Sequence, residues 1–451
     1  MKHRLLVTSL LALVLAGASA HASTLYWSGN GTALGGVGTW NTTGANWGTS
    51  TSGPFTTVWN NANSDSAFLS GLSTQGGTGL VTLGVPITMN GTLTWQQTPG
   101  TYPSYSIVGS STLTFSAGST LNCNNSVGGG IYVGYLNAPY AGTITKTGTG
   151  LVNFNNNNGN VTKFIFQAGT VNFSGPTRFG SGVDRSDFLT MDGGAWRGDV
   201  TAWGSVGKSM SLTANGGTVT AFSSATVITM DKPITSTGAG RLTVSGVQLT
   251  LSNTGNSWTG PMTISGTGGK LTLGAANVIP DTCWVTVSAT LNLNGFSETI
   301  FDLDGTGSVT LGAGTLTLTR GSHTFSGAIS GSGGFTLSGG AGETLSGNNT
   351  YTGPTTVNAG PLIFSGASTC TGITTVNSGG TLRIATSGTA FPDSPINLAS
   401  SGSTLDVNNL SVTIAALSGT GVVSNNASQT LTVNGNLTTG GGTGTGLYVY
   451  S

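Results

Sequence analysis

Short runs in which apolar residues alternate with Thr, Ser or Asn recur along the chain, and Gly-rich segments separate them. Typical runs are Leu113-Thr114-Phe115, Leu249-Thr250-Leu251 and Leu316-Thr317-Leu318. A period of two is the pattern of a β-strand with one buried face. Because each run is only about three to six residues long, none can form an independent sheet. The pattern therefore predicts many short strands that stack on one another.

Internal repeats indicate how the strands stack. The segments Thr350–Asn358 and Thr369–Asn377 align without gaps at an offset of 19 residues, and Ser257–Ser265 carries the same pattern. A longer repeat matches Thr290–Val309 with Thr404–Val423. A unit of about 20 residues with two or three short strands has the length of one coil of a parallel β-helix. We therefore expect an all-β fold, a right-handed single-stranded parallel β-helix (solenoid).

Glycine and asparagine are expected to form the corners of the coils. Gly accounts for 76 of the 451 residues, and it adopts positive φ without steric cost, while Asn tolerates the left-handed region. The sequence thus predicts Gly/Asn-rich turns. Runs of Asn at residues 124–125, 155–158 and 348–349 are compatible with amide ladders between coils or with solvated loops, and both interpretations stay open.

Five segments can be distinguished along the chain. Residues 1–22 resemble a secretory signal peptide, because Lys2 and Arg4 precede an apolar run and a cluster of small residues. No later run reaches the ~18 consecutive apolar residues of a membrane-spanning helix, so we expect no transmembrane helix in the mature chain. The other segments are a Trp/Gly-rich N-terminal cap (23–60), degenerate coils (61–248), clear repeats (249–439) and a Gly-rich tail (440–451).

Composition excludes several classes of protein. Charged residues make up 6% of the chain, where about 25% is usual, and the polar half is rich in Thr, Ser and Asn, which favour strands over helices. The hydrophobic content of 36% supports a buried core. The net charge is zero and no basic run is present, which argues against nucleic-acid binding. Three widely spaced cysteines, Cys123, Cys283 and Cys370, are expected to fill strand positions.

The repeats resemble the autotransporter-associated β-strand repeat, also called the passenger-associated transport repeat. Residues 344–360 carry the resemblance most clearly, and 249–265 form a degenerate copy. The resemblance implies a β-helical passenger that moves to the cell surface, with repeats that aid secretion or folding. The residues expected to carry the repeat motif are Trp258, Thr259, Gly260, Tyr351, Thr352, Gly353, Cys370, Thr371 and Gly372.

The chain departs from the family pattern at its C-terminus. Full-length members commonly end in a translocator barrel, whereas this sequence ends at Ser451 without one. Three interpretations stay open: the chain is a fragment, another protein supplies the route across the outer membrane, or the product stays in the periplasm.

Candidate chemistry is sparse. The carboxylates in the densest group of charged side chains are candidates to share a groove, where they would act as general acid and base or bind Ca²⁺. The alternative is a solvated loop in which the Asp and Arg side chains pair locally. Asp302 and Asp304 form a second pair, but the other repeat copy has Ala416 and Ser418 there, so the repeat does not require carboxylates. His323 is isolated in the sequence and is expected at the surface, so no catalytic triad is expected. The charge-dense group consists of Asp184, Arg185, Asp187, Asp192, Arg197 and Asp199.

Aromatic residues near the N-terminus are the remaining binding candidates. Trp27, Trp40 and Trp47 lie close to Trp59 among Gly and Asn residues. Their rings are candidates for weak glycan contacts, or they cap the first coil, which would otherwise present an unpaired sheet edge. The cap is the favoured interpretation.

Together, these features predict an exported, non-catalytic protein that serves as a surface stalk, display scaffold or adhesin. We expect no catalytic residue, cofactor or metal, and a monomer. The expected location is the extracellular or outer-membrane surface of a bacterium, or the periplasm without a translocator. The expected partners are surface glycans or the outer-membrane secretion machinery. The alternatives are a carbohydrate-active β-helix enzyme of the polysaccharide lyase or glycosidase type, and a secreted glycan-binding module.

Overall fold

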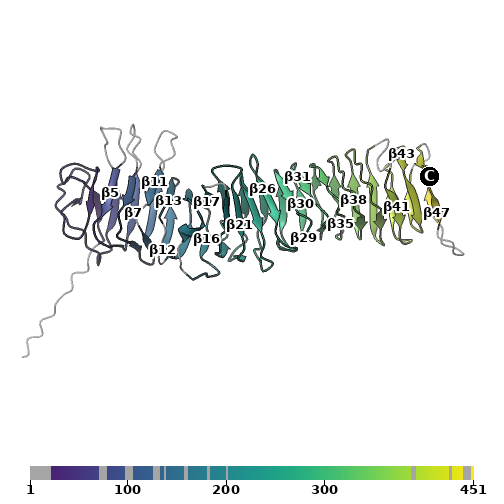
Figure 1. The fold of residues 1–451 in the computed structure, drawn as a ribbon. Coiled ribbons are helices and arrows are strands. Elements are labelled where there is room, and N and C mark those ends of the chain that lie inside the picture. Colours follow the sequence, from purple (N-terminus) through teal and green to yellow (C-terminus); the bar gives the residue numbers. More distant parts are fainter. Residues whose placement is uncertain are drawn as a thin grey trace, which may run out of the picture.

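The structure is a rod of stacked β-strand coils. The computed structural model describes residues 22–70, 79–96, 105–124, 133–136, 139–156, 161–179, 183–199, 202–386, 393–425, 429–439 and 448–450. Figure 1 shows the strands stacked along one long axis, from the N-terminal strands at one end to the C-terminal strands at the other. Almost all regular structure in these ranges is β-strand, apart from the short 3-10 turn η1 (Pro176–Phe179). Most of the predicted signal peptide and C-terminal tail lies outside the described residues.

One side of the rod carries two sheets in succession, which an isolated parallel bridge between Gly305 and Phe325 connects. The 12-stranded β2–β30 sheet comprises β2 (Gly38–Trp40), β5 (Gly79–Leu83), β8 (Tyr105–Val108), β11 (Val133–Leu136), β13 (Leu151–Phe154), β15 (Thr170–Phe173), β17 (Ala195–Gly198), β20 (Gly217–Ala221), β23 (Leu242–Ser245), β25 (Met262–Ser265), β27 (Trp284–Val287) and β30 (Asp302–Asp304). The 7-stranded β33–β48 sheet comprises β33 (Thr324–Phe325), β36 (Glu343–Leu345), β38 (Gly360–Phe364), β40 (Gly380–Ile384), β42 (Thr404–Asp406), β45 (Val422–Ser424) and β48 (Tyr448–Tyr450).

Another sheet begins at the N-terminal end. The β1–β22 sheet comprises β3 (Trp47–Gly48), β1 (Thr24–Trp27), β4 (Ser66–Leu69), β7 (Thr92–Gln96), β10 (Thr120–Asn124), β12 (Tyr140–Thr147), β14 (Val161–Phe166), β16 (Leu189–Met191), β19 (Met210–Leu212) and β22 (Ile234–Ser236), with β6 (Ile87–Met89) and β9 (Leu113–Phe115) attached through β12. The 8-stranded β29–β47 sheet takes its place in the later coils and comprises β29 (Glu298–Ile300), β32 (Leu316–Leu318), β35 (Phe335–Leu337), β37 (Thr355–Val357), β39 (Thr374–Val376), β41 (Pro395–Leu398), β44 (Ala416–Gly419) and β47 (Leu437–Thr439).

A third set of strands makes the middle coils three-sided, so that β20, β21 and β22, for example, belong to three different sheets. The β18–β34 sheet comprises β18 (Ala202–Ser205), β21 (Val227–Met230), β24 (Gln248–Leu251), β26 (Lys270–Leu273), β28 (Thr290–Asn292), β31 (Ser308–Thr310) and β34 (Ile329–Ser330). A two-stranded sheet of β43 (Val412–Ile414) and β46 (Leu431–Val433) follows near the C-terminal end.

The pairing between coils is parallel, which confirms the predicted parallel solenoid. Among the paired strands of the described residues, only β1 and β3 run antiparallel. Parallel strands need long connections, and here each connection is the rest of the coil. No helix in the described residues is long and apolar enough to cross a membrane.

Inward side chains form continuous ladders along the rod axis. In the β18–β34 sheet, parallel register aligns one aliphatic side chain from each successive coil, and all of these side chains are fully buried. Each buried aliphatic side chain stabilises the fold by about 1.5–3 kcal/mol relative to an exposed one. One such ladder consists of Leu249, Leu271, Leu291, Val309 and Ile329.

The corners confirm the predicted turn chemistry. Many glycines in the described residues have positive φ, and the non-glycine residues with positive φ are all asparagines. This follows from sterics, because only Gly avoids a Cβ clash in the left-handed region and Asn is the side chain that best tolerates it. The four asparagines are Asn277, Asn294, Asn408 and Asn409.

Candidate functional sites along the solenoid

The repeat motif places one large side chain per copy in the core. Trp258, Tyr351 and Cys370 occupy matching positions, and each is at most 1% exposed. The Tyr351 hydroxyl lies 2.7 Å from Oγ1 of Thr355. Burial raises the pKa of the Cys370 thiol to about 12, so this thiol behaves as a packing group and not as a nucleophile. Cys123, Cys283 and Cys370 are all free and buried.

The motif glycines are needed because the backbone of the preceding coil is too close for a side chain. A Cβ on Gly260, Gly353 or Gly372 would come within 3 Å of a glycine carbonyl oxygen one coil earlier. Their φ angles lie outside the positive region, so close approach, and not the left-handed conformation expected from the sequence, explains these glycines. The contacts form a glycine ladder of Gly314, Gly333, Gly353 and Gly372.

The motif threonines are the exposed part of the repeat. Thr259, Thr352 and Thr371 all point to solvent between a buried large residue and the ladder glycine. The backbone N–H of Thr352 donates to the carbonyl of Gly331 at 2.9 Å. The threonines therefore contribute to inter-coil pairing through the backbone, and their side chains cover the outer surface.

A buried asparagine of the run at residues 348–349 belongs to the repeat motif, although it was not among the residues expected to carry that motif. Asn349 is fully buried, two positions before Tyr351. Its Oδ1 accepts from the N–H of Ile329 in the preceding coil at 3.0 Å, and its Nδ2 donates to Oγ of Ser368 in the following coil at 3.1 Å. The side chain thus connects three coils. The signal in the sequence was the equal spacing of Asn from the large residue in two repeat copies.

The matching Asn256 makes the same type of bridge. Its Oδ1 accepts from the N–H of Ile234, and its Nδ2 donates to the carbonyl of Val278, both at 2.8 Å. Amide contacts between coils also occur at unpredicted positions, as where Nδ2 of Asn377 donates to Oδ1 of Asn358 at 2.7 Å. Residues 125, 157 and 158 of the predicted Asn runs lie outside the described residues.

The tryptophans near the N-terminus form a buried cluster. Trp27, Trp40, Trp47 and Trp59 are at most 1% exposed, and their ring centroids lie 4.9–5.2 Å apart, mostly edge to face. Strand β3 pairs with the edge of β1 that faces away from β4. The candidate glycan contacts Trp27, Trp40 and Trp47 therefore present no open ring face to a sugar in this structure. Their burial fits the alternative interpretation, in which the cluster covers the first coil.

The charge-dense stretch is held by contacts between neighbouring coils. The carboxylate of Asp187 lies 2.7 Å from Nζ of Lys163 and 3.5 Å from Nε of Arg185. The hydrogen bond from Lys163 is the main cause that lowers the pKa of Asp187. Asp184 instead accepts from the N–H and hydroxyl of Ser209 at 2.7 and 2.8 Å. The two carboxylates thus have separate partners, which is the arrangement of a local ion-paired loop.

Two of the other charged residues of that stretch also have structural partners. Asp192 accepts from Oγ1 of Thr213 and Nδ2 of Asn215. Arg197 lies over the ring of Phe222 at 5.5 Å, and Asp199 is exposed. No group of three or more His, Cys, Asp or Glu that could hold a metal occurs in the ranges that the structure describes.

The His323 side chain is 32% exposed, but it is not isolated, contrary to the expectation from the sequence. Its Nδ1 lies 2.7 Å from Oδ2 of Asp302, which is 1% exposed. Ser322 donates to the same carboxylate from its N–H at 3.1 Å and from its hydroxyl at 2.6 Å. The residues meet because they are 20 or 21 positions apart, which is one coil. We call Trp284, Asp302, Ser322, His323 and Glu343 the Asp302–His323 cluster.

Two further members complete the cluster. The ring of Trp284 packs on His323 with centroids 4.3 Å apart and a tilt of 34°. Glu343 is fully buried, and its Oε2 accepts from the N–H of His323 at 3.3 Å. Burial, reinforced by the negative charge of Asp302, raises the pKa of Glu343 to about 9. Glu343 is therefore protonated at neutral pH.

The cluster lacks the geometry of a catalytic triad. A triad needs the carboxylate on one imidazole nitrogen and the nucleophilic hydroxyl on the other. Here the Ser322 hydroxyl lies 3.0 Å from Nδ1, the nitrogen that also contacts Asp302. The hydroxyl thus serves to hold the Asp302 carboxylate, and its placement does not support nucleophilic catalysis.

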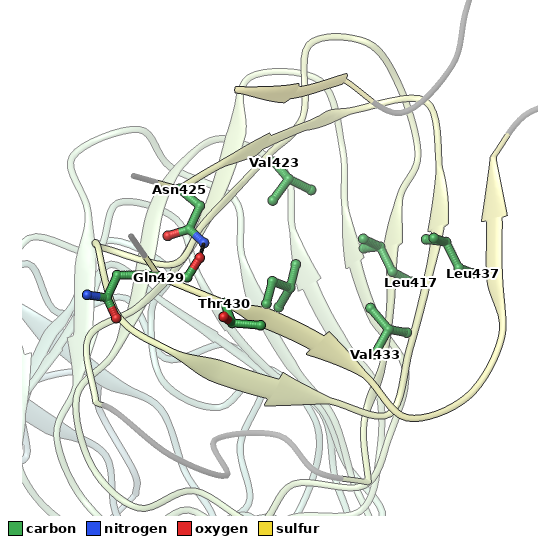
Figure 2. A pocket seen from close by; sticks show the side chains of 8 residues that line it. Leu417, Val423, Asn425, Gln429, Thr430, Val433 and Leu437 are labelled. Atoms are coloured by element: carbon green, nitrogen blue, oxygen red, sulfur yellow. Dashed lines mark hydrogen bonds between the residues drawn. The ribbon is translucent and has the colours of Figure 1, made fainter. Parts of the chain in front are cut away.

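An apolar pocket of about 320 Å³ lies near the C-terminal end of the rod. Figure 2 shows the side chains of Leu417, Val423, Val433 and Leu437 around this space. They come from β44, β45, β46 and β47, and the polar lining consists of Asn425, Gln429 and Thr430. Because the lining has no titratable side chain, the pocket offers contact area and no acid–base chemistry.

Comparisons with known proteins agree with the repeat architecture. The family model described as the passenger-associated transport repeat matches residues 248–266, 343–362 and 360–384. These ranges include the three buried motif positions Trp258, Tyr351 and Cys370. The extension of the repeats to residue 439 stays a prediction.

One curated relative is the adhesin BmaC autotransporter of Brucella suis biovar 1 (strain 1330), which is 34% identical over 284 residues. The match covers 59% of this chain and 7% of that protein, so the chain spans a small part of the relative's length. No solved structure matches. The matched segments therefore show that the chain carries passenger-associated transport repeats, and the stacked coils show that it has a parallel β-solenoid fold.

Proposed function

We propose that the chain is a non-catalytic, passenger-type shaft that contributes to bacterial adhesion at the cell surface. The observation that carries this proposal is the stack of coils along the described chain, in which side chains such as Asn256 and Asn349 bond to neighbouring coils. Such a stack gives length and stiffness, because each coil buries its core against its neighbours. The similarity to an autotransporter adhesin supports the same function.

The repeats also fit a role in secretion-coupled folding. Contacts in a solenoid join residues one coil apart, so each coil can fold on the coil before it. Asn349 forms hydrogen bonds to the coils on both sides. Together with the glycine ladder, it sets the distance at which each new coil packs on the preceding one. Export through a signal peptide at residues 1–22, a final location at the extracellular or outer-membrane surface, and the secretion machinery as partner belong to this proposal.

Residues 23–60 act in this proposal as the N-terminal cap. An open end of a parallel sheet would expose unpaired N–H and C=O groups that invite aggregation. The antiparallel strand β3 occupies that edge of β1, with Trp27 opposite Trp47. The packed indole rings of the tryptophan cluster cover the core at the same end.

The proposal is tested by displaying the chain on a non-adherent bacterial strain through an unrelated anchor. The displayed chain should increase attachment to epithelial monolayers above that of cells with the anchor alone. Deletion of residues 353–371 removes one repeat, the segment between the ladder glycines Gly353 and Gly372. This variant keeps the register of the coils and should retain attachment. A variant that lacks residues 353–362 breaks the register and should lose it.

Two outcomes would contradict the proposal. Attachment equal to that of the anchor-only strain would remove the adhesive function. Polysaccharide cleavage by the purified chain, detected as new reducing ends or unsaturated uronates, would favour the carbohydrate-active enzyme instead.

A further inference from the structure

Trp284 differs from the other tryptophans of the chain in its exposure. Eight of the nine tryptophans are at most 2% exposed, whereas Trp284 is 38% exposed. Strand β27 alternates with Val285 and Val287 in the core, so Trp284 lies on the outer face. A large ring kept on the solvent side gains little for the core, and such residues commonly mark binding surfaces.

Polar groups surround Trp284 on the same face. In the strand register, Trp284 lies beside Asp302, and Thr286 lies beside Asp304. Asp304 is half-buried, and its Oδ1 accepts from the N–H of Gly305 at 2.7 Å. The second carboxylate oxygen of Asp304 has no hydrogen-bond partner among the described residues. The face thus combines a flat apolar ring with an available hydrogen-bond acceptor.

His323 is fixed in position before any ligand binds. Its ring packs on Trp284, and its Nδ1 is held by the buried carboxylate of Asp302. Asp302 is in turn held by the N–H groups of Leu303 and Ser322 at 3.0 and 3.1 Å. The His323 side chain remains 32% exposed, and its Nε2 has no partner within the described ranges. Side chains locked in this way lose little entropy when they bind a ligand.

We propose that Trp284, Asp304 and His323 form a contact site for neutral saccharides. The apolar face of a sugar ring would pack on the indole of Trp284, as aromatic rings with an apolar face and polar surroundings allow. Sugar hydroxyls would donate to the Asp304 carboxylate and bond with Nε2 of His323. The carboxylates of Asp302 and Asp304 favour a sugar without a carboxylate or sulfate group over an anionic one.

This inference rests on the proposed adhesive function, and it replaces the buried N-terminal tryptophans as the glycan contact. Trp284 was not singled out in the sequence, because its polar neighbours come from coils 18 and 39 residues later. The register of the coils therefore creates the site.

The test uses the purified chain of residues 23–451 on an array of neutral hexose and N-acetylhexosamine oligosaccharides and their sialylated counterparts. Wild type should bind neutral members more strongly than sialylated ones. Trp284→Ala should weaken binding by about tenfold or more, since it removes the packing surface. Trp284→Phe should retain part of the binding. Phe222→Ala is the matched control, because Phe222 is an exposed aromatic residue (73%) outside the cluster, and it should bind like wild type.

Circular dichroism establishes that each variant is folded. If Trp284→Ala fails to fold, Asp304→Asn is the deciding variant. It preserves the shape of the side chain but replaces a carboxylate oxygen that accepts from the sugar, so it should reduce binding about tenfold. Absence of array binding by wild type, or equal binding by wild type and the deciding variant, overturns the site. Monolayer attachment without array binding overturns only this site, whereas array binding without attachment overturns the adhesive function and supports the site.

Discussion

Replacement of Gly353 by alanine tests whether close contact between coils sets the position of the motif glycine. A Cβ at this position would come within 3 Å of the carbonyl group of Gly333 and of the carbonyl oxygen of Ser332. Both are backbone atoms, which cannot rotate away as the end of a side chain can. The substitution therefore forces neighbouring coils apart at one corner.

The magnitude follows from two effects. Adding a methyl group to a closely packed site costs about 1–3 kcal/mol in strain. Separation of the coils also weakens nearby pairing, such as the 2.9 Å hydrogen bond from the N–H of Thr352 to the carbonyl of Gly331, at about 1 kcal/mol. The expected local destabilisation is about 2–4 kcal/mol.

Hydrogen exchange is the appropriate assay, because long repeat arrays do not unfold as a single two-state unit. The amides of Thr352 and Thr355 should exchange about 30- to 1,000-fold faster in Gly353→Ala than in wild type, the equivalent of 2–4 kcal/mol. Gly340→Ala is the control. No atom lies within 4 Å of a Cβ at Gly340, and its φ is not positive, so exchange there should be unchanged or slower. Equal exchange in both variants and wild type would refute the reasoning.

Three further predictions concern buried polar groups. Asn349→Ala should destabilise the chain by about 2–3 kcal/mol, because it leaves the buried N–H of Ile329 unpaired; denaturant melts check this, and a melt identical to wild type would argue against the bridge. Glu343 has its pKa raised from 4.5 to about 9 by burial. The protonated Glu343 carboxyl therefore contributes its full stabilisation below pH 4.5. As the pH rises toward 9, the free energy of unfolding falls by up to about 1.4 kcal/mol per pH unit. Glu343→Gln should flatten the decline in stability between pH 5 and 9, and an unchanged decline would contradict the assignment. The buried thiols of Cys283 and Cys370 should resist a thiol-specific reagent until the chain is denatured, and rapid labelling of the native protein would contradict their burial.

The period-two pattern predicted the strands, because each short strand shows its buried face locally, and the internal repeats of about 20 residues predicted the parallel stack. Leu249 and Leu271 illustrate this: each lies in an alternating run, and each occupies the same inward ladder. The equivalence of Trp258, Tyr351 and Cys370 was also visible in the sequence, because the repeat aligns them directly.

The polar contacts were harder to predict because they depend on which residues face one another in successive coils. His323 appeared isolated, yet register places it against Asp302, 21 residues earlier. The N-terminal tryptophans were compatible with glycan contacts or with a cap on the first coil, and their burial in the structure fits the cap. The glycine ladder was attributed to turn conformation because the distance between coils is not encoded in any single repeat.

Small-angle X-ray scattering of the chain of residues 23–451 tests the stacked-coil architecture most directly. The 12-stranded and 7-stranded sheets on one side of the rod, at about 4.8 Å per strand, give a length on the order of 90 Å. The account predicts the distance distribution of a rod with a maximum dimension of about 90 Å or more. A symmetric distribution ending near ~60 Å, as for a compact globe of this chain length, would contradict it.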